Sequence, residues 1–62
     1  MRREDCTSTI GDGVDAQEVH RGLVASGKVV VVKVHPEEHV VIYKEPMGGR
    51  EISVWYHNMP VV

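Results

Sequence analysis

The stretch "KVVVVKVHPEEHVVIYKEPMGGREISVWYH", residues 28–57, decides the fold of this 62-residue chain. It contains three runs rich in valine, isoleucine and aromatic residues, which favour strands. The runs cover residues 28–35, 39–45 and 50–57, and they are separated by the turn sequences "PEE" and "PMGG". Turns this short join antiparallel neighbours, so we predict a three-stranded antiparallel meander.

The segment before the strands, residues 11–27, predicts one helix. Asp12 or Asp15 can cap its first turn, because an aspartate there accepts a hydrogen bond from a backbone N–H that has no partner within the helix. Gly27 suits the left-handed conformation in which many helices end. The helix is therefore bounded by signals at both ends.

Val19 and Leu23 lie one turn apart on this predicted helix and form the face that would contact the sheet. Gly22 inside the helix costs roughly 1 kcal/mol relative to alanine, which suggests that another backbone comes close to it. We therefore predict an α+β fold with one N-terminal helix packed on the three-stranded meander.

The chain has room for one domain, which we place at residues 12–62. Residues 1–11 are then either a flexible tail or, through Cys6 to Ile10, a short extra edge strand. A domain this small has a marginal core, which a metal, a docked terminus or a second copy of the chain commonly stabilises.

The turn lengths give a register for the sheet. If residues 36–38 form the first tip, His35 lies opposite His39, and the second turn places Glu45 opposite Glu51. Two glutamates opposite each other are unfavourable, so a bulge or a shift by one residue near "PMGG" is the alternative. One face of the sheet is then nearly all apolar and suited to receive the helix. That face holds Val30, Val32, Val34, Val40, Ile42, Lys44, Ile52, Val54 and Tyr56.

The opposite face carries an aromatic and aliphatic patch, and its residues are Val31, Lys33, Val41, Tyr43 and Trp55. A monomer seldom leaves such a patch exposed without use, and tryptophan and tyrosine are common anchors of protein interfaces. We therefore predict a small non-catalytic regulatory or adaptor protein that binds another protein through this patch.

The run of four valines at residues 29–32 also predicts self-association, because it lies on an edge strand of the meander. Either Cys6 to Ile10 pairs alongside this edge, or a second copy of the chain does. We expect a homodimer that uses the edge, the Trp55 face, or both.

An alternative function is single-stranded nucleic-acid binding, in which Tyr43 and Trp55 stack on bases and Lys33 and Arg50 contact phosphates. The overall charge gives this reading no support, since seven basic residues stand against nine acidic ones, for a net charge of −2. Protein binding is the better use of the patch.

A second alternative is a zinc or nickel site. The predicted register places His35, His39 and His57 in one row across the sheet, and Cys6 or a water could complete a tetrahedron. The simpler interpretation is that these strand-end histidines are solvated, so we expect no cofactor. Clustered imidazoles would also respond to pH near their usual pKa.

The remaining observations concern chemistry and location. We assign no catalytic residue, because Cys6 is accompanied by no oxyanion turn, and we expect the protein not to be an enzyme. No apolar run approaches a membrane span and no signal peptide is visible, so we expect a cytoplasmic protein with no membrane partner. Its size also fits an inhibitor encoded by a phage or mobile element.

Overall fold

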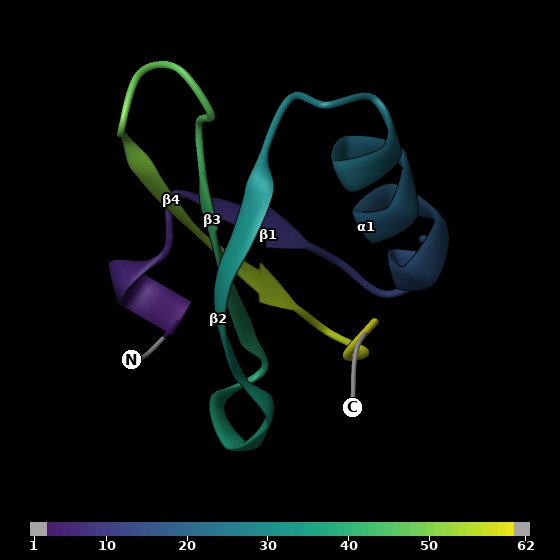
Figure 1. Cartoon of the computed structure of the whole chain (residues 1–62). Coiled ribbons are helices and arrows are strands. Elements are labelled where there is room, and N and C mark those ends of the chain that lie inside the picture. The colour runs from purple at the N-terminus through teal and green to yellow at the C-terminus, as the bar shows by residue number, and fades with distance from the viewer. Residues whose placement is uncertain (1–2, 61–62) are drawn as a thin grey trace.

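The computed structural model describes residues 3–60 and shows one helix beside one sheet in this part of the chain (Figure 1). The regular elements are β1 (Ser8–Ile10), α1 (Ala16–Ala25), β2 (Val30–His35), β3 (Val40–Lys44) and β4 (Glu51–Tyr56). Single turns of 3₁₀ helix, η1 (Arg3–Asp5) and η2 (Pro36–Glu38), precede β1 and join β2 to β3. The ends of the predicted ranges, residues 1–2 and 61–62, lie outside the described residues.

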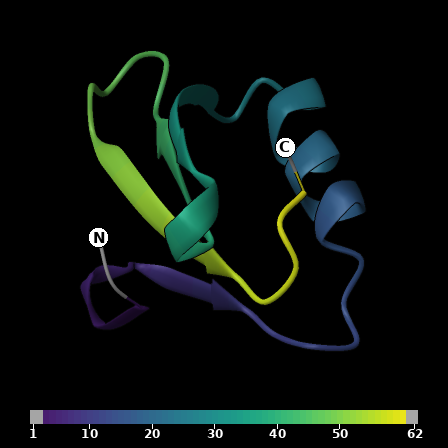
Figure 2. The same ribbon diagram turned by 90° about the horizontal axis from the view of Figure 1, so that it is seen from below.

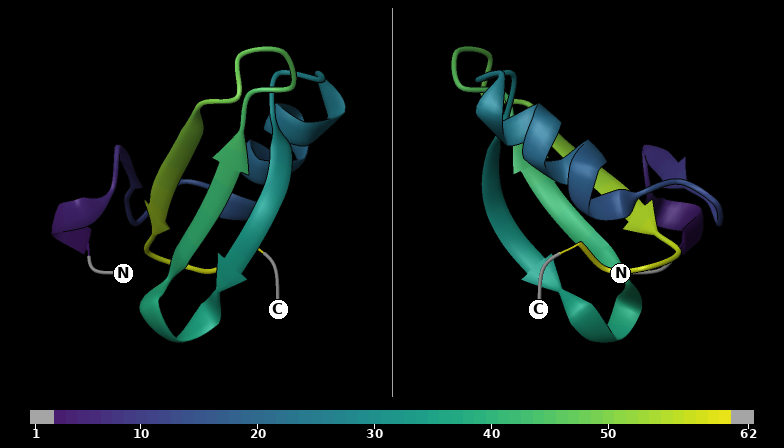
Figure 3. Two further views of the ribbon diagram at one scale, coloured as in Figure 1. Left: turned by 60° about the vertical axis from the view of Figure 1, so that its left-hand side comes forward. Right: turned by 90° about the vertical axis from the view of Figure 1, so that its right-hand side faces the viewer.

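The sheet formed by the described residues has four strands in the order β1-β4-β3-β2, with β1 parallel to β4 and the other neighbours antiparallel. The predicted α+β class is confirmed. The three predicted antiparallel strands are present, but the sheet is not a three-stranded meander, because the N-terminal strand that the prediction gave as a possibility adds a parallel pair. The extra strand is shorter than expected and pairs with β4, not with β2. Consequently β2 and β1 form the two edges of the sheet, and α1 lies against one face (Figure 3).

The helix begins and ends for the reasons that the sequence indicates. The side chain of Asp15 accepts a hydrogen bond from the backbone N–H of Glu18, at 3.3 Å, and so caps the first turn. Gly27 follows the last turn with φ +75°, a conformation that glycine adopts without strain. Val19 and Leu23 pack against the core, which confirms the predicted face of the helix.

The interpretation of Gly22 is wrong. A Cβ atom built at this position would meet nothing within 4 Å, so no backbone comes close to it. Gly22 lies on the solvent side of α1, where it only weakens the helix.

The connection between β2 and β3 takes one residue more than predicted. His39 adopts the left-handed conformation, with φ 59°, and closes the η2 turn through a 3.3 Å hydrogen bond to the Pro36 carbonyl. His35 is therefore paired with Val40, not with His39. A bulge at Val32 absorbs the difference, so the register returns to the predicted pairing further along β2.

The pairing of β3 with β4 also differs by one residue from the prediction. Lys44 lies opposite Glu51, where Glu45 was predicted. The observed register puts opposite charges across the two strands and avoids a like-charge pair. Glu45 instead belongs to the loop, where its N–H donates to the Arg50 carbonyl at 3.0 Å.

Because of these shifts, the two faces of β3 are exchanged relative to the prediction. Val41 and Tyr43 face the helix, and Val40, Ile42 and Lys44 lie on the other face of the sheet. The facing of β4 is confirmed, because Ile52, Val54 and Tyr56 lie on the helix side. On β2 the prediction holds for Val34 but is wrong for Val30 and Val32, which are 48% and 47% exposed.

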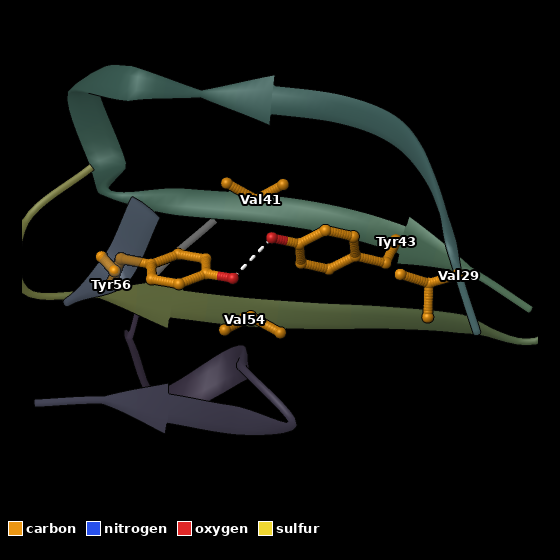
Figure 4. Packing of buried hydrophobic residues seen from close by; sticks show 6 residues of the cluster. Val29, Val41, Tyr43, Val54 and Tyr56 are labelled. Atoms are coloured by element: carbon orange, nitrogen blue, oxygen red, sulfur yellow. Dashed lines mark hydrogen bonds between the residues drawn. The ribbon is translucent and has the colours of Figure 1, made fainter. Parts of the chain in front are cut away.

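The core lies between α1 and the sheet (Figure 4). Its buried members are Ala16, Val29, Val41, Tyr43, Val54 and Tyr56. Ile10 from β1 and Met59, which follows β4, pack against its margin. Figure 2 shows how α1 stands to one side of the sheet while the turn η1 lies at the far end of β1. In residues 3–60 no helix is both long and apolar enough to cross a bilayer.

Replacing Gly22 by alanine is expected to raise the free energy of unfolding by about 1 kcal/mol, because alanine favours the helix and meets no obstacle. In a domain of this size the gain corresponds to a rise in melting temperature of roughly 4–8 °C. Differential scanning calorimetry measures it. The control is Gly27→Ala, which must lower the melting temperature because φ is positive there. A Gly22→Ala variant no more stable than the wild type would contradict this description of the helix.

Candidate functional site

The structure divides the predicted protein-binding patch between the two faces of the sheet. Val41 and Tyr43 are 0% and 1% exposed beneath the helix. Lys33 and Trp55 lie on the opposite, outer face, and Val31 lies at the open edge on the helix side. The five residues therefore do not form one surface, because the predicted register turned β3 the wrong way.

Trp55 is half-buried, because side chains of the same chain surround its ring. The Arg3 guanidinium lies 4.9 Å from the ring centroid. The His39 ring is stacked on it at 5.9 Å, and His57 meets it edge-on at 6.1 Å. Val40, in the same cross-strand row, is fully buried. This end of the outer face is thus a small second cluster, which leaves less of the indole available than the sequence suggested.

The residues of the nucleic-acid alternative are also dispersed. Tyr43 is buried on the helix side, where it cannot stack on a base. Lys33 and Trp55 share the outer face but stand in different cross-strand rows. Arg50 lies in the loop before β4, beyond the opposite end of the strand from Trp55. No basic and aromatic surface arises from these four residues.

The predicted row of histidines does not form. His35 lies opposite Val40 on β2. The Nδ1–H of His39 donates to the carbonyls of Tyr56 and His57, at 3.1 and 3.0 Å, and so fixes the η2 turn to the end of β4. The exposed His57 ring lies 3.9 Å from the Asp12 carboxylate. Within residues 3–60 no group of three or more histidine, cysteine, aspartate or glutamate side chains is placed to hold a metal ion.

A hydrogen-bonded chain of side chains inside the core was not predicted from the sequence. The hydroxyls of Tyr43 and Tyr56 lie 2.5 Å apart (Figure 4). The Tyr43 hydroxyl is also 2.7 Å from Nδ1 of His20 on the helix. With neutral His20, Tyr43 can donate to the imidazole and accept from Tyr56. The spacing of the two tyrosines gives no signal of this contact unless the register is known.

Burial determines how these three groups titrate. It raises the pKa of the Tyr43 hydroxyl well above its usual range, and the hydrogen bond to Tyr56 adds to the rise. Burial also raises the pKa of Tyr56. Removal of solvent lowers the pKa of His20, so the imidazole is neutral at neutral pH. The chain of hydroxyls therefore lies in the core as a neutral, structural network.

The edge of β2 is open and largely apolar. Val30, Val31 and Val32 follow one another there and are 48%, 41% and 47% exposed. In residues 3–60 no strand pairs with the outer side of β2. The opposite edge differs, because β1 has three residues and is mostly polar. Short, polar edges resist pairing with other chains, whereas long apolar edges invite it.

Comparisons with protein-family models, with curated proteins and with solved structures find no match to this chain. The geometry of the described residues is therefore the basis for assigning a function.

The hydroxyl chain makes a prediction about stability. Tyr56→Phe removes one hydrogen bond and leaves Tyr43 paired with His20, so we expect a loss of about 1 kcal/mol. Tyr43→Phe removes both hydrogen bonds and leaves the Tyr56 hydroxyl without a partner, so the loss of stability is larger, about 2–3 kcal/mol. Urea denaturation compares the two variants. Equal losses would show that Tyr43 is not the central member of the chain.

His20 gives a prediction about pH. Its pKa is lowered in the folded state, so the unfolded chain binds a proton that the folded chain does not. The contribution of His20 is therefore complete above its unfolded pKa of about 6.5 and decreases as the pH falls below it. Urea midpoints at about pH 7.5 and about pH 5.5 measure the effect against His20→Gln, which lacks the titrating ring. An identical decrease in both proteins would contradict the assignment.

Proposed function

We propose that this chain is a small non-catalytic protein that acts by pairing its β2 edge with a strand of another chain, in a regulatory or adaptor role. The observation that carries the proposal is the exposed valine run at Val30–Val32, on an edge that pairs with no strand among residues 3–60. Exposed backbone N–H and C=O groups on such an edge supply hydrogen bonds, and neighbouring side chains supply specificity.

The same edge supports a homodimer as the first assembly. If β2 of a second copy pairs antiparallel with β2 so that the two Val31 residues lie opposite each other, valines face valines across the interface. The two Lys33 side chains are then apart. A parallel copy in register would place Lys33 beside Lys33. A net charge of −2 gives only weak repulsion between copies.

The dimer would also enlarge a small core. Val31 shares its cross-strand row with Tyr43 and Ile52 on the helix side. A second Val31 beside it extends this apolar row across the interface and buries surface that is now in water. The bulge at Val32 and the presence of Lys33 limit which strands fit, since both features discourage unspecific pairing.

The non-catalytic part of the proposal is supported by the location of the hydroxyl chain. Tyr56 is fully buried and Tyr43 nearly so, and their hydroxyls are bonded to each other and to His20. Hydroxyls that are buried and hydrogen-bonded in this way are not accessible to a substrate.

The homodimer is tested by sedimentation velocity at micromolar concentration. We expect the wild type to be a dimer and Val32→Lys to be a monomer, because a lysine in the valine run opposes edge pairing. The matched control is Val24→Lys, which makes the same change at an exposed valine on the helix and should leave the dimer intact. A monomeric wild type throughout the micromolar range would contradict the homodimer.

Amide hydrogen exchange locates the interface. Residues 30–35 should exchange more slowly as the protein concentration rises, whereas residues 8–10 at the opposite edge should not change. Protection that appears on α1 instead would place the interface elsewhere.

A further inference from the structure

The two ends of β2 carry opposite charges. Lys28 lies in the bend just before the strand and is exposed. The turn η2 follows the strand directly and carries Glu37 and Glu38, which are also exposed. A base therefore precedes the exposed valines at Val30–Val32 and acids follow them. This edge of the sheet thus has a direction of charge as well as apolar side chains.

Within one copy of the chain, Lys28 and Glu37 are not paired. Neither forms an ion pair with another side chain among residues 3–60. Glu45 lines the same surface hollow as Lys28, yet no salt bridge joins the two. The six residues of β2 separate Lys28 from Glu37 by about 20 Å, so these two charges cannot reach each other. Both are therefore available to a second chain.

Antiparallel pairing of β2 with β2 of a second copy brings the unlike ends together. If the two Val31 residues lie opposite each other, Lys28 lies opposite the partner's Val34, because each is three residues from Val31. The partner's Glu37 follows after one strand step and two 3₁₀ steps, about 7 Å along the chain. A lysine and a glutamate side chain together cover that distance.

We infer that the homodimer is fixed in this antiparallel register by two symmetric ion pairs, each between Lys28 of one copy and Glu37 of the partner subunit. The inference rests on the proposed function, since it requires pairing at the β2 edge. Parallel pairing in register would place Lys28 beside Lys28 and one acidic turn beside the other, which is unfavourable. Complementary charges across an interface contribute mainly to its specificity. Here they select a second copy of this chain, which presents an acidic turn where Lys28 can meet it.

The test is charge reversal in the full chain, with the dimer dissociation constant measured by sedimentation equilibrium. Lys28→Glu and Glu37→Lys each place like charges at both contacts, so each should raise the dissociation constant about tenfold. The first change makes the net charge more negative and the second removes it, so a loss in both variants cannot come from general repulsion. The control is Arg21→Glu, the same change of charge at an exposed position on α1, which should leave the dimer unchanged.

Mixing the two variants tests the contact directly. A heterodimer of Lys28→Glu with Glu37→Lys has unlike charges at both contacts, so the mixture should dimerise about as tightly as the wild type. One chain that carries both changes should recover in the same way. If the wild type is a dimer and Val32→Lys a monomer, but mixing gives no gain, the ion pairs are overturned and the edge pairing stands. A monomeric wild type would overturn the proposed function together with this inference.

Discussion

The hydrogen bond between Tyr43 and Tyr56 constrains the rest of the structure. These are the two largest fully buried side chains in the described residues, and each carries a hydroxyl that must find a partner away from water. The two hydroxyls are hydrogen-bonded to each other at 2.5 Å, and His20 on the helix is hydrogen-bonded to the Tyr43 hydroxyl. Sheet register, helix position and core packing therefore depend on one another. A slip of β3 by one residue would carry Tyr43 to the outer face and separate the pair.

The local elements of this fold could be predicted from the sequence, because their signals are local. Asp15 and Gly27 bound the helix by their own chemistry, and the turns around Pro36 and Gly49 separate the strands. The register could not be predicted in the same way. It depends on His39 entering the left-handed region and on the extra residue at Val32, and neither feature has a distinctive sequence pattern. Only the charges of Lys44 and Glu51 favoured the observed pairing in advance.

The errors in the predicted sites follow from one error in the predicted register. The strand at 28–35 was correctly expected at an edge, because a meander must leave its first strand with one free side. The sheet-face patch was wrong, since it required Tyr43 and Trp55 to point the same way. The hydroxyl chain of His20, Tyr43 and Tyr56 was also not predictable, because its contacts form only in the observed register.

The parallel pairing of β1 with β4 sets the order in which the domain can be completed. Residues 8–10 have no sheet partner until residues 51–56 exist, so the first strand of the chain is the last to be secured. Because β4 lies between β1 and β3, any local opening that detaches β4 from β3 also separates β1 from the rest of the sheet, so these two strands open together.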